Sequence, residues 1–335
     1  MKSPSRSAVP VWELSLCVLI LGAGAWSARL SPYYLGVDQI FGSTRFFIIS
    51  GLLALGLTVV VVGGEIDISL ASTLAVGTVS LSKLSAAGVP VPVAAAIAVV
   101  ICGALGALNG LLVARYRLPS LAVTLGTMGA YRGLAFIIGS EVGYTDFSDS
   151  YLWVGSANLF GDIVPVSLLI FAALAALFGF LLHRTVYGRQ CFSIGLNRDA
   201  AWFSGVEVDR VKIRAYALAG ALAGVAALVW IGQYGSARGD NADGSILFVV
   251  TAVVLGGVDI NGGRGTLAGV VLALMLLGTI RNGMGLANIG GPTQTVVLGT
   301  LLVAGVLRPA ASAGLSRLRR VSGPAPTDTE KEMSK

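Results

Sequence analysis

The chain has 335 residues, of which 55% are hydrophobic and only 12% are charged. A globular domain carries about 25% charged residues, so this chain lacks the charge needed to cover a water-facing surface. The composition therefore excludes a soluble enzyme and places most of the chain in lipid. Since a membrane-crossing helix needs about 20 apolar residues, ten crossings would leave short loops and no large soluble domain.

The inventory of reactive residues is small. His183 is the only histidine, and Cys17, Cys102 and Cys191 lie far apart without CxxC spacing, so neither a metal site nor a disulfide framework is predicted. None of the five lysines follows a glycine, so the phosphate-binding GxxxxGK(S/T) loop is absent. We expect this chain to bind no metal or cofactor and not to act as an enzyme by itself.

Ten apolar segments are predicted to cross the membrane as helices. Most are free of charge, and two are interrupted only by Asp67 or by Arg132. In chain order they cover residues 14–28, 46–64, 66–82, 84–114, 118–139, 163–182, 215–237, 244–258, 265–280 and 282–307. The predicted fold is an all-α, polytopic integral membrane protein with about ten transmembrane helices.

The distribution of Lys and Arg predicts the orientation. With the N-terminus inside, most of the 23 basic residues fall on the cytoplasmic side, as the positive-inside rule requires. Residues 1–10 are then a cytoplasmic segment, residues 11–309 the transmembrane domain with a cytoplasmic loop at 184–214, and residues 310–335 a disordered cytoplasmic tail. The net charge of +6 reflects this topology and anionic lipid, so no nucleic-acid partner is expected.

Two glycine-rich stretches repeat at the same spacing. Gly63-Gly64 precedes a Thr-Leu-Ala triplet at Thr73, and Gly256-Gly257 precedes another at Thr266. Glycine-interrupted spans in the two halves of a chain indicate a transport site, because a broken helix exposes backbone groups to a cavity. The alternative is that small residues only permit close helix packing. The matched spacing favours a duplicated functional element.

Four stretches of the sequence resemble the membrane permeases of bacterial ABC importers for monosaccharides, the ribose, rhamnose and autoinducer-2 type. They are GGEIDIS at 63–69, LPSLAVTLGTMGAYRG at 118–133, residues 188–201 and residues 254–266. The family pattern most often reads GGIDLS, whereas Glu65 is inserted here. GEID, with residues 182–185 and 203–212, looks most like the rhamnose subgroup, while Trp12-Glu13-Leu14 and residues 235–238 resemble autoinducer-2 permeases.

The resemblance implies a set of partners. Residues 11–309 would form a permease domain in the bacterial inner membrane beside a second permease chain, identical or paralogous. Cytoplasmic ABC ATPase subunits would bind ATP and Mg²⁺, and a periplasmic sugar-binding protein would deliver the cargo. Rhamnose is the favoured cargo, with autoinducer 2 or ribose as alternatives.

The loop at 184–214 is the only long cytoplasmic loop in the predicted topology. Its Asp199-Ala-Ala-Trp-Phe stretch can form a short amphipathic helix that docks in a groove of a partner. We expect this loop to contact the ATPase, the alternative being a basic loop held at the lipid surface. The predicted coupling residues are Gly188, Arg189, Asn197, Ala200, Ala201 and Gly205.

Polar side chains inside spans are costly and are candidates for function. Thr124, Thr127 and Arg132 follow one another at helical spacing, and a shared face would line a sugar path. Arg132 could instead snorkel or pair with a carboxylate to lock helices together. Asn109 and Gln233 are further path candidates, and interhelical hydrogen bonds explain them equally well.

Glu65 and Asp67 are predicted to accept backbone N–H groups at the first broken helix, with Asp67 as an N-cap. Asp259, Asn261 and Arg264 would do the corresponding work in the second copy. The full set of broken-helix candidates is Gly63, Gly64, Glu65, Asp67, Ser69, Gly256, Gly257, Asp259, Asn261 and Arg264.

Other classes of function fit less well. An ion-coupled secondary transporter would need a carboxylate deep inside a span, whereas the acids here lie near predicted span ends. A permease of the same architecture for branched-chain amino acids or nucleosides is a second alternative, but the 63–69 motif resembles the sugar group better. A purely structural anchor would leave the two repeats unexplained.

Overall fold

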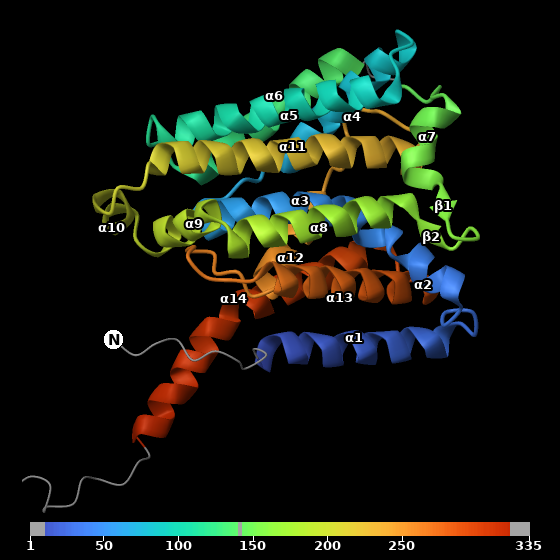
Figure 1. Ribbon diagram of the computed structural model, residues 1–335. Helices are drawn as coiled ribbons and strands as arrows, with labels where there is room; N and C mark the ends of the chain where they lie inside the picture. Colours follow the sequence, from blue (N-terminus) through green and yellow to red (C-terminus); the bar gives the residue numbers. More distant parts are fainter. Residues whose placement is uncertain (1–10, 140–142, 322–335) are drawn as a thin grey trace, which may run out of the picture.

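The computed structural model describes residues 11–139 and 143–321, which form a bundle of roughly parallel and antiparallel helices (Figure 1). The long apolar helices are α1 (Val11–Leu30), α3 (Arg45–Val62), α4 (Leu70–Ala86), α5 (Val91–Ala114), α6 (Ser120–Gly139), α8 (Val166–Arg184), α11 (Val208–Tyr234), α12 (Ser245–Leu255), α13 (Leu267–Leu286) and α14 (Gly291–Val321). Shorter elements are α2 (Val37–Ser43), α7 (Asp149–Ser156), α9 (Val186–Leu196), α10 (Arg198–Phe203), and the paired strands β1 (Asn158–Leu159) and β2 (Val164–Pro165).

The architecture confirms the predicted all-α polytopic fold. Within residues 11–139 and 143–321, seven helical segments are long and apolar enough to cross a membrane, and α12 and residues 291–307 are shorter apolar helices. Each of the ten predicted segments coincides with one of the long helices. The orientation of the termini stays a prediction.

Two predicted boundaries differ from the structure because a charged residue was taken as a turn. Lys83 lies in the last turn of α4, and Arg281 lies inside α13. A long basic side chain can stay in a helix and extend its charged head to the interface. The chain turns later, at Gly88 and Asn288, both of which have positive φ.

Helices α3 and α11 form the centre of the bundle. Nearly all of α3 is buried, and α11 packs along α5 through glycines (Figure 1). A Cβ at Gly106 of α5 would collide with the backbone of Tyr216, and one at Gly220 of α11 with the backbone of Cys102. Helix α1, by contrast, packs mainly on α13 and leaves most of its apolar surface exposed, as expected for a lipid-facing helix.

The C-terminal helix is longer than predicted. Helix α14 continues to Val321, whereas the predicted span ends at residue 307 and a disordered tail was expected from residue 310. Residues 310–321 contain Ala, Leu and Arg, which favour helix. The rest of that predicted tail, residues 322–335, and the predicted N-terminal segment, residues 1–10, lie outside the described residues.

Candidate transport site at two broken helices

The first double glycine ends helix α3 in a Schellman turn. Gly63 is the C-cap, and Gly64 adopts a left-handed conformation with φ of 80°. The Glu65 N–H donates to the Val60 carbonyl at 3.2 Å, and the Gly64 N–H to the Val61 carbonyl at 2.9 Å. Glycine suits this turn because a side chain disfavours positive φ.

The second double glycine ends α12 in the same way. Gly256 is the C-cap, and Gly257 has a φ of 89°. The Val258 N–H donates to the Val253 carbonyl at 3.2 Å, and the Gly257 N–H to the Val254 carbonyl at 3.0 Å. The repeat seen in the sequence is therefore also a repeat of backbone geometry.

An acidic side chain shapes the turn that follows each double glycine. Asp67 Oδ1 accepts the Ser69 N–H at 2.9 Å and the Ser69 hydroxyl at 2.6 Å. Asp259 Oδ1 accepts the Asn261 N–H at 3.0 Å and its amide at 3.1 Å. Both acids thus bond to a residue two positions on, as in an Asx turn. The N-cap position of α4, which begins at Leu70, is occupied by Ser69, so the prediction that Asp67 is the N-cap was wrong.

Side chains of α5 and α6 hold the first broken helix from one side. Asp67 and Ser69 are fully buried. The Asn109 amide of α5 donates to Ser69 Oγ at 2.9 Å, and the Tyr131 hydroxyl of α6 donates to Asn109 Oδ1 at 3.0 Å. The structure therefore places Asn109 in an interhelical network.

The backbone of the first break is held at Ile66. The Tyr216 hydroxyl of α11 donates to the Ile66 carbonyl at 3.2 Å, and the buried Thr124 hydroxyl lies 3.4 Å from the same oxygen. The Ile66 N–H lies 3.4 Å from Ser120 Oγ. Broken segments are tolerated in membranes only where their backbone groups find partners, and α6 and α11 supply them here.

Glu65 points away from the backbone of its own turn. Its carboxylate forms an ion pair with the Lys212 ammonium near the start of α11. The prediction that Glu65 accepts backbone N–H groups was therefore wrong. Its partner, Lys212, lies 147 residues away in sequence, so no local pattern could have indicated it.

The second broken helix is held by α1 and α8. The Thr266 hydroxyl, which caps α13, donates to Glu13 Oε1 of α1 at 2.6 Å. The Leu267 N–H donates to His183 Nε2 at the end of α8 at 3.2 Å. Arg264 contributes its backbone carbonyl, which accepts the Asp259 N–H at 3.0 Å. Sequence reasoning missed Glu13 and His183 as partners, since nothing local links them to this turn.

The two broken helices meet each other and the predicted cytoplasmic loop at three glycines. A Cβ at Gly262 would lie 2.6 Å from the Gly64 Cα and 3.0 Å from the Gly195 Cα of α9. The Gly263 N–H donates to the Val62 carbonyl at 2.9 Å, which joins the two breaks directly. We call Gly64, Gly195 and Gly262 the glycine junction. It brings both repeats against the segment predicted to contact an ATPase.

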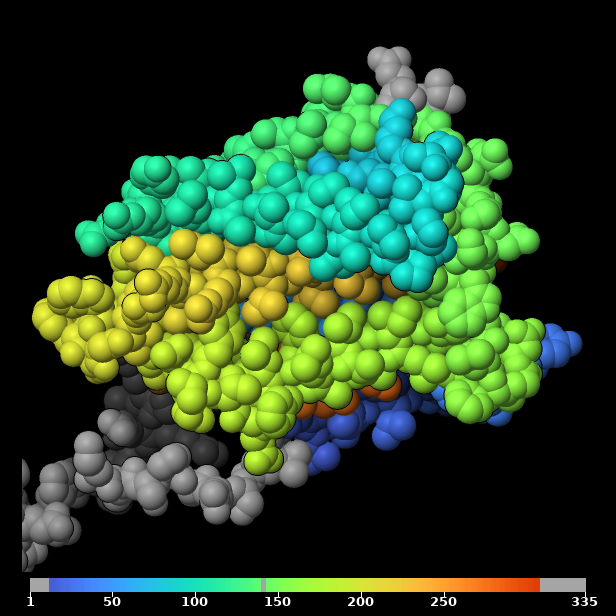
Figure 2. All heavy atoms as spheres, turned by 45° about the horizontal axis from the view of Figure 1, so that its top comes forward, coloured from blue at the N-terminus to red at the C-terminus, as the bar shows by residue number. Residues whose placement is uncertain are grey.

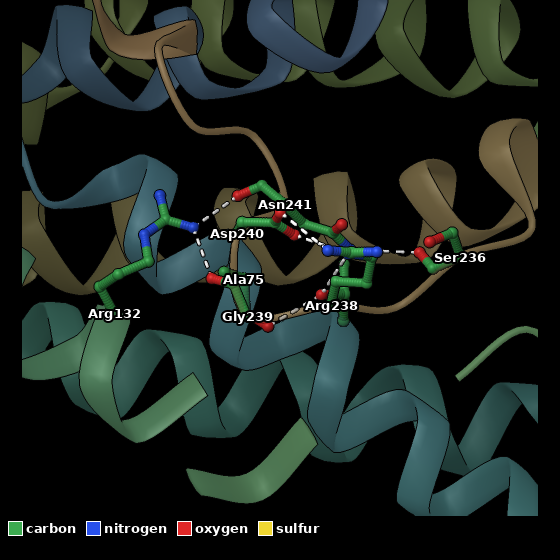
Figure 3. Close-up of polar contacts among 8 residues, drawn as sticks. Ala75, Arg132, Ser236, Arg238, Gly239, Asp240 and Asn241 are labelled. Atoms are coloured by element: carbon green, nitrogen blue, oxygen red, sulfur yellow. Dashed lines mark hydrogen bonds and ion pairs between the residues drawn. The ribbon is translucent and has the colours of Figure 1, made fainter. Parts of the chain in front are cut away.

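Arg132 lies toward the other end of α6 and binds the connection between α11 and α12 (Figure 3). Its guanidinium donates to the Gly239 carbonyl at 2.7 Å and the Asn241 carbonyl at 2.8 Å. Asp243 lies 3.9 Å away. Arg132 therefore binds the connection between α11 and α12 to α6, and the structure does not gather it into one cluster with Thr124.

The remaining path candidates lie apart from each other. The Thr127 hydroxyl is 3.4 Å from the Thr124 carbonyl within α6, and Thr127 is partly exposed. The Gln233 amide of α11 donates to the Arg45 carbonyl at 3.2 Å. Among the described residues, Gln233 Oε1 is buried and has no hydrogen-bond partner.

The same connection carries a second pair of charges, Arg238 and Asp240 (Figure 3). Arg238 Nε lies 3.0 Å from one Asp240 oxygen, and its Nη2 lies 3.2 Å from the other. This bidentate contact lowers the pKa of Asp240 below its usual value. The Asp240 carboxylate therefore stays ionised beside the Arg132 guanidinium.

The predicted cytoplasmic loop folds into two short helices. The Thr185 hydroxyl accepts the Gly188 N–H at 3.2 Å and caps α9, and Asn197 Oδ1 accepts the Ala200 N–H at 2.9 Å and caps α10. Gly205, with a φ of 84°, follows α10 before α11 begins. The short helix predicted in this loop is confirmed, and the loop projects at one end of the molecule (Figure 2).

Some apolar residues of α10 are buried in the protein, and others are exposed on its surface. Ala201 is buried, whereas Trp202 is 63% exposed and Phe203 is 80% exposed. Their ring centroids lie 4.9 Å apart. Beside them lies an open cleft of about 710 Å³, lined also by Arg117 and Arg198. Two exposed aromatic side chains beside a cleft that is lined by charged residues are suited to docking a partner protein.

The helical bundle and its broken helices define a multi-pass membrane transport component. The family described as "Branched-chain amino acid transport system / permease component" matches residues 39–306. The chain is 32% identical over 324 residues to the Autoinducer 2 import system permease protein LsrD of Escherichia coli, and equally so to LsrD of Shigella flexneri, covering 94% of this chain and 98% of each relative. No solved structure matches.

The chain therefore belongs to this family of transport permeases. The predicted resemblance to import permeases is confirmed, and so is the multi-pass location in a bacterial inner membrane. The finer resemblance to the rhamnose subgroup is not confirmed.

Proposed function

We propose that this chain is the permease subunit of an ABC importer, with ATP and Mg²⁺ bound by separate ATPase subunits. The family match over residues 39–306 carries this proposal. The lack of a phosphate-binding GxxxxGK(S/T) loop in the sequence agrees with a separate energy source. A second permease chain would complete the path, and an extracytoplasmic binding protein would deliver the cargo.

Autoinducer 2 is the first cargo to test, because the LsrD relatives are autoinducer-2 import permeases. The GEID motif favoured rhamnose in the sequence analysis, but the relatives do not support that preference. Rhamnose and ribose therefore rank after autoinducer 2. A branched-chain amino acid is the fourth candidate, since the description of the family names that cargo.

Burial and hydrogen bonds separate the polar candidates for the translocation path into two groups. Asn109 and Thr124 are buried and bond to the first broken helix, so we assign them to holding that break. Thr127 and Arg132 are partly exposed and remain the better candidates for contact with cargo. Gln233 keeps a buried acceptor free among the described residues and stays a candidate.

The proposed ATPase contact is α10 with its exposed Trp202 and Phe203. Replacing both by alanine should remove the ATPase from the purified complex, because exposed aromatic residues commonly dominate docking energy. Trp153 of α7 is 52% exposed and lies in another part of the chain, so Trp153→Ala is the matched control. Retention of the ATPase by the double variant would refute this contact.

Uptake of labelled compounds in a deletion strain tests the transport function and its cargo together. Radiolabelled autoinducer 2, rhamnose, ribose and leucine would each be offered to the parent, the deletion strain and a complemented strain. We expect one uptake activity to be lost on deletion and restored by the gene, with autoinducer 2 first. Unchanged uptake of all four compounds would contradict the proposed cargo class.

A further inference from the structure

The ion pair between Glu65 and Lys212 connects two segments that the chain separates by 147 residues. Glu65 follows Gly64 directly after the first double glycine. Lys212 is the fifth residue of α11 and lies seven residues after Gly205. The pair therefore joins the first broken helix to the helix that leaves the cytoplasmic loop.

The ion pair between Glu65 and Lys212 is largely shielded from water. The side chains of Lys212 and Glu65 are only 10% and 16% exposed. The surface pair of Arg210 and Glu207, close by in sequence, is 69% and 63% exposed. Removing one partner of a buried pair leaves an uncompensated charge away from water, so the two backbones at Glu65 and Lys212 are constrained to move together.

The cytoplasmic loop packs directly against the pair. A small cavity beside it is lined by Cys191 and Ile194 of α9 together with Glu65, Lys212 and Tyr216. Because α9 also reaches the break through Gly195 in the glycine junction, movement of the loop would reach the first broken helix at two neighbouring points.

Each partner of the ion pair is preceded in the chain by a glycine with positive φ. Gly64 has a φ of 80° and Gly205 a φ of 84°, so the chain changes direction just before Glu65 and just before the start of α11. In the second repeat the residue directly after the double glycine is Val258, so no carboxylate occupies the position that matches Glu65. The ion pair thus distinguishes the first repeat from the second.

We propose that Glu65 and Lys212 are positioning residues for transport, which transmit movement of the ATPase-contacting loop to the first broken helix. This proposal rests on the proposed function, because it needs an ATPase that moves the loop. Loss of the pair should leave ATP hydrolysis running while less cargo moves for each ATP consumed.

The test uses the complete importer, reconstituted with its ATPase, second permease and binding protein in proteoliposomes. The quantity measured is radiolabelled cargo imported per ATP hydrolysed, with autoinducer 2 or whichever of rhamnose and ribose the deletion strain identifies. The variants are Glu65→Gln, Lys212→Met, the neutral double variant, and the swap Glu65→Lys with Lys212→Glu. Exposed residues at the other end of the bundle, Lys83 and Asp149, provide the controls Lys83→Met and Asp149→Asn.

We expect the single variants and the neutral double variant to lower the cargo imported per ATP by at least about fivefold. A factor of about five is the lower end of the coupling typically measured between two sites of a protein. The swap should recover part of that loss, and the controls should match the parent. If the singles fail to assemble, the neutral double variant decides, because it leaves no unpaired charge. A neutral double variant with the parental ratio would overturn the proposal. A parent complex whose cargo-loaded binding protein does not stimulate hydrolysis would instead contradict the proposed function.

Discussion

The two broken helices share a terminator and differ in what surrounds them. Both end in a Schellman turn at a double glycine, and both continue with an Asx turn. The first is buried and is held by α5, α6 and α11. The second is more exposed, closes on itself through Asp259, and is held at its far end by α1 and α8.

The two breaks therefore share their backbone geometry but differ in their side-chain partners. The first break has an ion pair to the start of α11, next to the predicted ATPase contact. The second break connects α12 to α13, and its hydrogen bonds go to α1 and α8. We therefore assign the first break to coupling with the cytoplasmic partner and the second to supporting the bundle.

The largest expected effect is at the glycine junction, which both breaks share. A Cβ at Gly195 would meet the backbone of Val62 and Gly263. Gly195→Ala should destabilise the protein by about 3 kcal/mol, the upper end of the usual range for overpacking, because the added Cβ would meet backbone atoms. Thermal melting in detergent measures this. Gly22→Ala is the control, because nothing lies within 4 Å of a Cβ there; equal melting of the two variants would contradict the junction.

A matched pair of acids tests the contrast between the breaks. Asp67→Ala removes two hydrogen bonds at a fully buried site and should destabilise by about 1–3 kcal/mol. Asp259→Ala removes the equivalent bonds at an exposed turn and should stay within about 0.5 kcal/mol. Thermal melting and cargo uptake should fall in the same order. Equal losses in both variants would remove the distinction between the breaks.

Arg132 tests the contact between α6 and the connection that leads from α11 to α12. Arg132→Met removes two charge-assisted bonds to the Gly239 and Asn241 carbonyls and should destabilise by about 1 kcal/mol, because the site is partly exposed. Uptake should slow while expression stays normal. Arg281→Met, at an exposed position of α13, is the control. Normal uptake by Arg132→Met would show that this loop contact does not limit transport.

The smallest expected effect is the pH dependence of Asp240. Because Arg238 lowers its pKa, the contact stabilises the protein above the usual Asp pKa of about 3.9, and that stability is lost as pH falls through the lowered value. For a half-exposed pair the gain is only about 0.2–1 kcal/mol. Melting curves of the parent and Arg238→Gln should differ at neutral pH and converge once the pH falls below the lowered pKa of Asp240. A difference that grows with acidity would contradict this sign.

The sequence predicted the parts of the fold that depend on local patterns. Apolar runs located the helices, and the paired glycines at Gly63 and Gly256 located both breaks, because a left-handed helix terminator requires a specific residue type. The predicted turns at Lys83 and Arg281 were wrong. A charged residue can lie inside a helix near the membrane–water interface as well as in a loop.

Contacts between distant segments could not be predicted from one sequence. Glu13 and Thr266 are 253 residues apart, and Arg132 and Gly239 are 107 apart, so no periodicity links either pair. Asn109 shows the same limit, since a polar residue in a span can face a path or a neighbouring helix. Only the packed structure shows that its partner is Ser69.

The assignment of this chain as an ABC importer permease is tested most directly by measuring which energy source drives transport. The measurement uses proteoliposomes that contain the purified importer. Labelled cargo should accumulate only when ATP is inside with the ATPase and the loaded binding protein is outside, and the binding protein should stimulate hydrolysis. An imposed proton or sodium gradient should have no effect. Accumulation driven by such a gradient without ATP would show an ion-coupled transporter and contradict the assignment of this chain as an ABC importer permease.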